Sequence, residues 1–350
     1  MKTQIKVLVV DDSAIVRDIL STKLSQFSDI EIVGTAPDPY IARDKIVRLK
    51  PDVLTLDIEM PKMDGLSFLE KLMEYYPLPV IIISSITGRD KYAAIKALEI
   101  GAFDVVDKPD SQSDMQSFIE DIANKIRIAF AEKESFIYKS KQNSRILVEK
   151  RESTRLLARV STTGKMIGIG ASTGGTVALE FIIKNLPANL PPILIVQHMP
   201  PVYTKRFAER LDEISELRVK EAEDEEMIME GTVYIAKGGM HLGIENKGIS
   251  FFNRLVDTEK VHFQKPAVDV LFKEMAEKVG KNSIGILLTG MGKDGAEGLF
   301  NMKKMGAYTI AQDEASSVVW GMPKAAIEMD AAMEVLPLDK IPERIVSLCT

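Results

Sequence analysis

The first part of the chain alternates short apolar runs with longer stretches in which apolar residues recur at helical spacing. Near-continuous apolar strands separated by helices are typical of a parallel sheet covered on both faces. The pattern predicts a last helix from about Gln112 to Phe130. The predicted strands before it are Lys6 to Asp12, Glu31 to Ala36, Asp52 to Asp57, Val80 to Ser85 and Phe103 to Pro109.

A second series of strands and helices begins after residue 164. The two series are not sequence repeats of each other, but both predict an α/β fold with a doubly wound, three-layer sheet. We expect a flavodoxin-like first domain and a Rossmann-like α/β/α second domain. The predicted strands of the second are Met166 to Ser172, Ile193 to Met199, Thr232 to Gly239, Ser283 to Gly292 and Tyr308 to Asp313.

The segment between the two series is rich in Lys, Arg, Glu and Ser and has almost no strand pattern. Such a composition is typical of a linker, which could be helical in part. We therefore divide the chain into a domain of residues 1–127, a linker of residues 128–163 and a domain of residues 164–350. The alternative is a solvated surface helix within one larger domain.

Composition narrows the classes of protein. A chain of 350 residues, 45% of them apolar, can bury two cores, and a net charge of -6 argues against a protein that neutralises nucleic-acid phosphates. The single cysteine, Cys349, permits no internal disulfide and no cysteine-based metal site. No apolar run approaches the roughly 18 residues of a membrane span. We expect a cytoplasmic protein without membrane insertion.

Polar side chains gather at the predicted strand ends of the first domain. In open α/β sheets, chemistry collects beyond the carboxyl ends of the strands. An aspartate at one strand end is more often a helix cap than a ligand, but a set of this kind at one edge is rarely accidental. Its members are Asp11, Asp12, Asp57, Ser84 and Lys108.

This set suits phosphoryl chemistry with a divalent cation. Three carboxylates at one edge repel each other unless a hard cation lies among them, and Mg²⁺ prefers such oxygen ligands. Asp57 would be the nucleophile toward a phosphoryl donor. Lys108 would then compensate the charge of the acyl phosphate, and the hydroxyl of Ser84 would sense it.

The first domain resembles the receiver domain of two-component response regulators, over about residues 2–127. The resemblance rests on the acidic pair, on "DIEMPKMDGL" around Asp57 and on the Lys-Pro pair at 108–109. It implies Mg²⁺ bound by Asp12, Asp57 and the backbone carbonyl of Glu59, with Asp11 assisting. It also implies phosphotransfer from a histidine kinase to Asp57. One departure is Val105, because many receivers carry an aromatic residue there.

The segment "GIGASTGG", residues 168–175, admits several interpretations. No lysine follows its last glycines, so it is not a P-loop. Thr173 breaks the dinucleotide fingerprint, and the next strand ends in Gln197 and His198 rather than in an acidic residue, although a looser dinucleotide site stays open. The segment does fit G-x-S-x-G, the strand-turn-helix elbow that exposes a serine, with the helix beginning near Thr173.

The elbow serine, Ser172, needs a base and an orienting carboxylate to act as a nucleophile. Of the three histidines, His198 follows a strand at the same sheet edge. Asp294 follows another predicted strand, in "TGMGKDG". A turn aspartate is the alternative for Asp294 alone. For His241 and His262 we expect surface or packing roles, with a place on the wall of the cleft as the alternative.

The second domain resembles the catalytic domain of the CheB family of chemotaxis receptor methylesterases. The resemblance rests on "GIGASTGG", "VQHMP", "TGMGKDGA" and "WGMP". It implies Ser172 as nucleophile, His198 as general base and acid, Asp294 as orienting group, and backbone amides around Thr173 and Met291 as oxyanion donors. It implies hydrolysis of glutamyl methyl esters on chemoreceptors, with deamidation of some glutamines, and no cofactor for this chemistry.

We expect a monomer whose receiver domain packs over the active-site edge until Asp57 is phosphorylated. Two other classes of protein are the alternatives. A DNA-binding response regulator lacks support, because no basic recognition helix follows the linker. A scaffold with a degenerate triad is disfavoured, because all three triad positions are filled.

Overall fold

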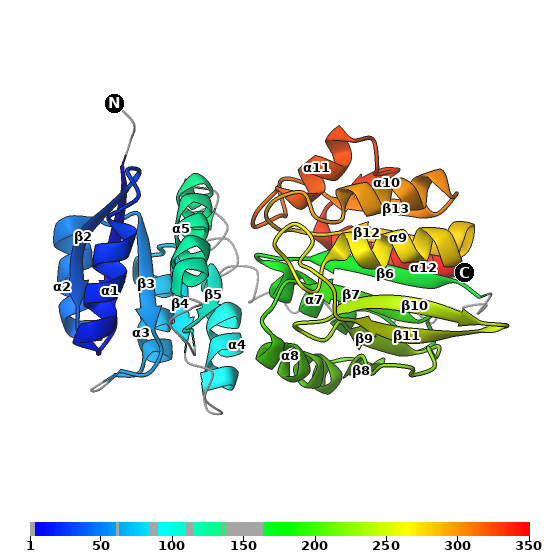
Figure 1. Cartoon of the computed structure of the whole chain (residues 1–350), viewed down its shortest axis with the longest axis horizontal. Helices are drawn as coiled ribbons and strands as arrows, with labels where there is room; N and C mark the ends of the chain where they lie inside the picture. Colours follow the sequence, from blue (N-terminus) through cyan, green and yellow to red (C-terminus); the bar gives the residue numbers. More distant parts are fainter. Residues whose placement is uncertain (1–3, 61–62, 85–89, 110–114, 135, 138–163) are drawn as a thin grey trace. The chain divides into compact units, whose positions relative to one another are not determined.

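The computed structural model describes residues 4–60, 63–84, 90–109, 115–134, 136–137 and 164–350. The chain divides into two compact units, Met1–Arg151 and Glu152–Thr350 (Figure 1). The predicted linker of residues 128–163 lies largely outside the described residues. Its first four residues belong to the last long helix of the first unit, which ends at Ala131.

The N-terminal unit contains a parallel sheet in the order β2-β1-β3-β4-β5. The chain runs from β1 outward to β2 and then crosses to β3 on the other side, so the topological switch point lies between β1 and β3. Its strands are β1 (Ile5–Val10), β2 (Ile30–Ala36), β3 (Val53–Asp57), β4 (Val80–Ser84) and β5 (Asp104–Asp107). Its helices are α1 (Ala14–Leu24), α2 (Pro39–Leu49), α3 (Gly65–Tyr75), α4 (Asp90–Ile100) and α5 (Met115–Ala131).

Local sequence signals set these elements. Every residue of β3 and of β4 is buried, as expected for central strands covered on both faces. Ser13, Asp38 and Asp64 cap α1, α2 and α3, because each side chain accepts an amide hydrogen bond from the first turn. The five predicted strands of this unit agree with β1 to β5 to within about two residues at each end, and the predicted last helix, from about Gln112, begins at Met115.

The C-terminal unit contains a seven-stranded sheet in the order β14-β13-β12-β6-β7-β9-β8, in which all pairs are parallel. Its switch point lies between β6 and β12. Its strands are β6 (Met166–Ala171), β7 (Ile193–Gln197), β8 (Arg218–Glu221), β9 (Thr232–Ile235), β12 (Ser283–Leu287), β13 (Tyr308–Gln312) and β14 (Glu334–Leu336). A separate antiparallel hairpin is formed by β10 (His241–Lys247) and β11 (Ser250–Val256).

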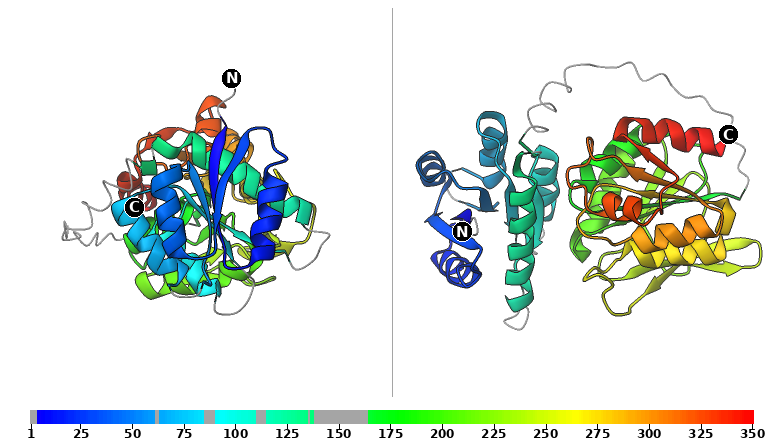
Figure 2. Two further views of the ribbon diagram at one scale, coloured as in Figure 1. Left: turned by 90° about the vertical axis from the view of Figure 1, so that its left-hand side faces the viewer. Right: turned by 90° about the horizontal axis from the view of Figure 1, so that it is seen from above.

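Helices cover both faces of this sheet (Figure 2). On one face α7 packs beside α8 and α12, and on the other α10 packs between α9 and α11. The helices are α7 (Gly175–Lys184), α8 (Pro201–Ile214), α9 (Val268–Lys278), α10 (Ala296–Lys304), α11 (Met322–Glu328) and α12 (Ile341–Cys349). The 3-10 turns are η2 (Gly280–Asn282) and η3 (Leu338–Lys340).

The predicted fold class, two doubly wound α/β domains, is confirmed. The strands β8 and β14 were missed, because "RVKE" and "EVL" are too short and too polar at the sheet edges to show an apolar run.

The close packing of α9 against the sheet requires small residues in β6. A Cβ at Gly168 would lie 2.5 Å from the sulfur of Met275, so glycine lets α9 approach the sheet closely.

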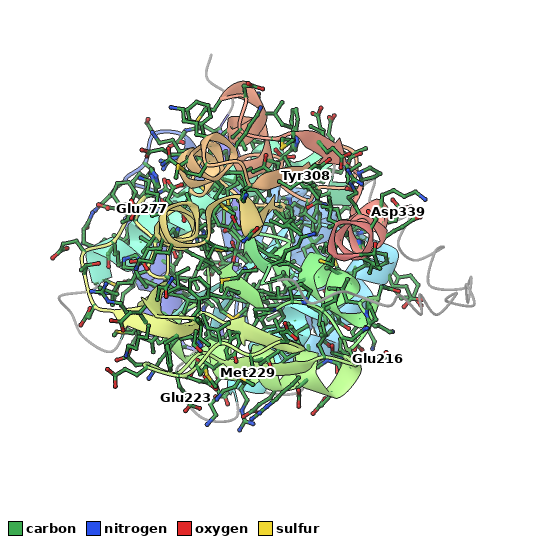
Figure 3. The ribbon with its side chains drawn as sticks, turned by 90° about the vertical axis from the view of Figure 1, so that its right-hand side faces the viewer. Glu216, Glu223, Met229, Glu277, Tyr308 and Asp339 are labelled. Carbon is green, nitrogen blue, oxygen red and sulfur yellow. The ribbon has the colours of Figure 1, made fainter. Side chains whose placement is uncertain are left out.

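The surface of the C-terminal unit carries dispersed acidic side chains. Glu216, Glu223, Glu277 and Asp339 are all exposed and lie around the periphery of the unit (Figure 3). Within the described residues, no helix has the length and apolar character needed to cross a bilayer.

Candidate functional sites

The predicted phosphorylation site lies at the switch point of the N-terminal unit. Asp11 follows β1 and Asp57 ends β3, and both side chains are almost completely buried. Carboxylate oxygens of Asp11, Asp12 and Asp57 lie within 4.8 Å of one another. The ammonium of Lys108, just after β5, lies 2.7 Å from Asp57 Oδ2 and 3.0 Å from Asp11 Oδ2. Lys108 thus pairs with two of the three carboxylates, while the guanidinium of Arg17 donates to the backbone carbonyls of Asp11 and Asp12.

The carboxyl of Asp57 is not held fully in its charged form by its neighbours. Burial raises the pKa of Asp57 to about 6, although the hydrogen bond and charge of Lys108 oppose the rise, and Asp11 adds to it. Burial would lower the pKa of Lys108, but the ion pairs with Asp57 and Asp11 raise it instead. An additional cation among these oxygens would relieve the remaining repulsion, which suits a hard divalent metal ion.

The other predicted residues of this cluster lie where the strand ends place them. Ser84 ends β4 and is buried, and its carbonyl accepts a hydrogen bond of 2.8 Å from the amide of Lys108. The amide of Glu59 lies 3.3 Å from Asp57 Oδ1, so Glu59 is in the loop around the acceptor carboxylate. Val105 is buried within β5.

The serine elbow of the C-terminal unit turns sharply after β6. Ser172 follows the last residue of that strand, and Gly174 adopts φ +77°, a left-handed conformation that favours glycine. The helix α7 therefore begins at Gly175 and not near Thr173 as predicted. A Cβ at Gly290 would lie 2.7 Å from Ser172 Cβ, so glycine lets the loop after β12 approach the serine.

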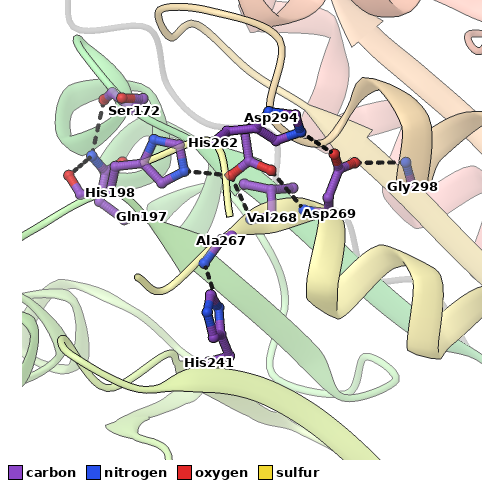
Figure 4. Close-up of polar contacts among 10 residues, drawn as sticks. All are labelled: Ser172, Gln197, His198, His241, His262, Ala267, Val268, Asp269, Asp294 and Gly298. Carbon is purple, nitrogen blue, oxygen red and sulfur yellow. Dashed lines mark hydrogen bonds and ion pairs between the residues drawn. The ribbon is translucent and has the colours of Figure 1, made fainter. Parts of the chain in front are cut away.

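The structure brings His198 and Asp294 into direct contact (Figure 4). His198 Nε2 lies 2.7 Å from Asp294 Oδ2, and both side chains are at most 5% exposed. Burial would raise the pKa of Asp294, but His198 and two backbone amides outweigh it and hold that pKa below its ordinary value. Asp294 is therefore ionised at neutral pH, and it orients the ring so that Nδ1 is the nitrogen left to act as base.

Ser172 and His198 follow β6 and β7, which are hydrogen-bonded neighbours in the sheet. The strands β12, β6 and β7 are neighbours, and Asp294, Ser172 and His198 follow them in that order. Among the described residues, no hydrogen bond joins the hydroxyl of Ser172 to His198. Contacts of this kind often form only when substrate is bound.

Gln197 is a site residue whose role the sequence did not reveal. Its side-chain Nε2 donates to the carbonyl of Ser172 at 2.9 Å and to the carbonyl of His198 at 3.2 Å (Figure 4). The side chain is buried, so these bonds are shielded from water. One amide group thus ties the backbone of the elbow serine to the backbone of the histidine.

The two predicted oxyanion donors lie on the loops that meet at Ser172. Thr173 is buried at the elbow, and its carbonyl accepts from the hydroxyl of Thr289 at 3.0 Å. Thr289 also accepts from the amide of Val319, so it links three loops. The amide of Met291 has no hydrogen-bond acceptor within the part of the chain that the structure describes, which leaves it able to bind an oxyanion.

His241 has the packing role that the sequence predicts. Its side chain is fully buried, and Nδ1 accepts from the amide of Ala267 at 3.2 Å. Its Nε2 lies 3.0 Å from the carbonyl of Glu259, to which it donates. The ring thus fixes the loop that leads into α9. His262 is different, because it pairs with the buried Asp269.

A buried acidic cluster with a lysine, at the switch point of one unit, is typical of a phosphoacceptor domain. An elbow serine near a buried His-Asp pair, at the switch point of the other, is typical of a serine hydrolase. The class of protein is therefore a response regulator with a hydrolase as its second domain. Residues 7–120 match the family model of the response regulator receiver domain, and residues 167–345 match that of the CheB methylesterase.

Full-length relatives agree with both matches. The chain is 49% identical over 346 residues to a protein-glutamate methylesterase/protein-glutamine glutaminase of Syntrophus aciditrophicus, covering 99% of each chain. It is 47% identical over 347 residues to such a protein of Sulfurimonas denitrificans, covering 98% of each. The methylesterase catalytic domain of Thermotoga maritima CheB matches 53% of this chain and 99% of its own, with 49% identity and a TM-score of 0.52.

The chain belongs to the CheB methylesterase family. Its receiver domain indicates control by phosphorylation, a reaction that commonly uses a divalent metal ion.

Proposed function

We propose that this protein hydrolyses glutamyl methyl esters on the cytoplasmic helices of chemoreceptors, and that phosphorylation of Asp57 stimulates the reaction. One observation carries the esterase assignment. Ser172, His198 and Asp294 follow three adjacent strands, and His198 lies 2.7 Å from Asp294. The relatives named as methylesterases and glutaminases support the substrate class.

In the acylation step, the hydroxyl of Ser172 attacks the ester carbonyl. His198 accepts the serine proton at Nδ1, because Nε2 donates to Asp294. The negative charge of Asp294 stabilises the imidazolium that forms. The same histidine then gives its proton to the leaving oxygen, so methanol departs and the glutamyl group stays on Ser172 as an ester.

Backbone amides would stabilise the tetrahedral oxyanion. We assign this role to Thr173 at the elbow and to Met291 on the loop after β12, whose amide lacks an acceptor among the described residues. Water activated by His198 then releases the glutamate. A glutamine side chain can follow the same route with ammonia as leaving group, which explains a glutaminase activity. No step requires a cofactor.

We propose Mg²⁺ as the divalent ion of the receiver domain, held by Asp12, Asp57 and the carbonyl of Glu59, with Asp11 assisting. The three carboxylates, whose oxygens lie within 4.8 Å, fit such an ion. The ion would supply positive charge beside Asp57, which would offset the repulsion between this carboxylate and an incoming phosphoryl group. The carboxylate of Asp57 accepts the phosphoryl group from a chemotaxis histidine kinase, Lys108 pairs with the phosphorylated product, and Ser84 contacts it.

The remaining assignments are proposals of the same kind. We assign the receiver to residues 1–127, the linker to 128–163 and the esterase domain to 164–350; the two family matches lie within the first and last of these. We propose a cytoplasmic monomer whose partners are methyl-accepting chemoreceptors and their kinase. Its buried single cysteine suits a reducing compartment.

Methanol release from methylated chemoreceptor membranes tests the proposal. We expect the full chain to release methanol and Ser172→Ala to reduce the rate by about 10³-fold or more, because the nucleophile is lost. Thermal melting of the variant should match that of the parent. Activity retained by a folded Ser172→Ala protein would remove the triad assignment.

A further inference from the structure

A second buried carboxyl group, that of Asp269, lies within 4.8 Å of the carboxylate of Asp294 and takes no part in the proposed reaction. Asp269, in the first turn of α9, is 0% exposed. Its Oδ1 accepts a hydrogen bond of 2.6 Å from the amide of Gly298, and its Oδ2 lies 2.9 Å from His262 Nε2 (Figure 4). Both oxygens of this buried carboxyl group therefore have hydrogen-bond partners, as burial of a polar group requires.

Asp269 and Asp294 cap each other's helices. Asp294 precedes α10, but its oxygens accept from the amides of Val268 and Asp269 at the start of α9, at 2.7 and 2.9 Å. Asp269 belongs to α9, but it accepts from Gly298 in the first turn of α10. The two helices pack side by side. A shift of Asp269 would therefore move both the amides that hold Asp294 and the helix that follows it.

His262 is the third side chain of this hydrogen-bonded group, through its contact with Asp269. Burial raises the pKa of Asp269 and the nearby charge of Asp294 adds to the rise, while Gly298, His262 and Lys273 act against it. His262 is thus a donor that helps to keep Asp269 ionised. The side chain of His262 is only 30% exposed, and its contact with Asp269 is accordingly shielded from solvent.

The backbone around His262 is held in an unfavourable conformation. His262 and Phe263 have φ of 51° and 63°, in the left-handed region that residues other than glycine rarely adopt. Such positions are strained and persist where surrounding contacts fix them. His241 anchors this loop through Glu259 and Ala267. The loop therefore presents the ring of His262 to Asp269 at the expense of local strain.

We propose that His262 and Asp269 are positioning residues for the esterase reaction: His262 donates to Asp269, and Asp269 fixes the Asp294 segment so that Asp294 stays aligned with His198. This inference rests on the proposed esterase function. Neither residue contacts substrate in the mechanism. Both residues act by holding Asp294 in place, which in turn orients the ring of His198.

The test compares His262→Leu, which cannot donate, with His262→Gln, whose carboxamide can. In the full chain on methylated receptor membranes, we expect His262→Leu to lower kcat about tenfold with little change in KM, since one charge-assisted hydrogen bond is lost. We expect His262→Gln to recover most of that loss. Phe263→Ala, in the same loop with a 91% exposed side chain, is the matched control and should keep the parent kcat.

A double-variant cycle separates positioning from general destabilisation. If His262 acts through Asp294, His262→Leu should add no further loss of kcat in an Asp294→Asn background. The full tenfold loss in that background, or a parent kcat in folded His262→Leu, would overturn the proposal. So would a His262→Gln variant that is no better than His262→Leu.

A measurement independent of activity keeps the two proposals apart. The proton between His198 Nε2 and Asp294 Oδ2 should give a low-field NMR signal in the parent, which broadens or shifts in His262→Leu and returns in His262→Gln. That result supports the positioning pair even if the parent protein releases no methanol, an outcome that would refute only the proposed ester substrate. An unchanged signal in His262→Leu would refute the positioning role.

Discussion

At the scale of single residues, both sites depend on buried polar groups whose partners come from distant parts of the chain. Lys108 meets Asp57 across 51 positions of sequence, and His198 meets Asp294 across 96. Strand-end positions predicted these pairs, because parallel strands bring their carboxyl ends to one edge. Gln197, Thr289 and Asp269 gave no comparable signal. Their side chains bond to backbone atoms, and no residue pattern marks such contacts.

Gln197→Met tests the amide that links the serine and histidine backbones. The change keeps the length of the side chain but removes the donor to Ser172 and His198. We expect a loss of about 1–3 kcal/mol in unfolding free energy, because both hydrogen bonds of the buried Gln197 amide are lost and the carbonyl of Ser172 keeps only the amide of Gly175 as donor, and a fall in kcat of about tenfold or more. Chemical denaturation and methanol release measure these effects. Parent values for both would contradict the role of Gln197.

The raised pKa of Asp57 predicts that the stability of the N-terminal unit depends on pH. Its pKa is raised from an unfolded value of 3.8 to about 6, so the folded state retains this proton over that range. Its contribution to stability is present below pH 3.8 and is lost as the pH rises through about 6. We therefore expect Asp57→Asn to raise the melting temperature of the N-terminal unit at pH 7.5 and to have a smaller effect at pH 5, where only part of this contribution has been lost, by calorimetry without divalent cations.

Added Mg²⁺ provides the control for this prediction. It should stabilise the parent at pH 7.5 by supplying the missing positive charge, and it should act more weakly on Asp57→Asn, which lacks one ligand charge. Equal melting temperatures for parent and variant at both pH values would contradict a raised pKa at Asp57.

At the scale of elements, α9 links the core of the C-terminal unit to its active site. Its first-turn amides hold Asp294, and its buried face packs against β6 through Phe272 and Met275. The glycines of "GIGASTGG" therefore serve two purposes. Gly168 admits α9 against the sheet, whereas Gly174 permits the turn that presents Ser172. The sequence motif alone predicted only the second.

Phe272→Ala tests this link. Phe272 is fully buried, and its truncation should lower the unfolding free energy of the C-terminal unit by about 3–5 kcal/mol, because a cavity opens under β6. Glu277→Ala, on the exposed side of the same helix, is the matched control and should change it by less than about 0.5 kcal/mol. Denaturant titration measures both. Similar values for the two variants would show that α9 does not depend on this contact.

At the scale of the whole molecule, both units have a doubly wound α/β fold, and each has its candidate site at the switch point of its sheet, with different chemistry. Each sheet is doubly wound, and each site lies at its switch point, between β1 and β3 or between β6 and β12. The chain therefore joins a site suited to accept a phosphoryl group to a site suited to ester hydrolysis. Regulation of the second by the first is a property of the intact chain.

Asp57→Asn in the full chain tests that regulation. A small-molecule phosphodonor with Mg²⁺ should increase methanol release by the parent but not by the variant, because asparagine cannot form the acyl phosphate. The basal rate of the variant shows that its esterase domain is folded. Stimulation that persists in Asp57→Asn would mean that control does not pass through this residue.

The sequence by itself determined the fold class, the strands that carry the sites and the polar residues able to take part in chemistry. Apolar periodicity and the residues at strand ends can be recognised from neighbouring positions in the chain. Only the tertiary structure decided which nitrogen of His198 faces Asp294, that Gln197 joins Ser172 to His198, and that the amide of Asp269 donates to Asp294. These contacts join β6, β7, α9 and α10. They exist only after the sheet has brought those elements together, and no local pattern encodes them.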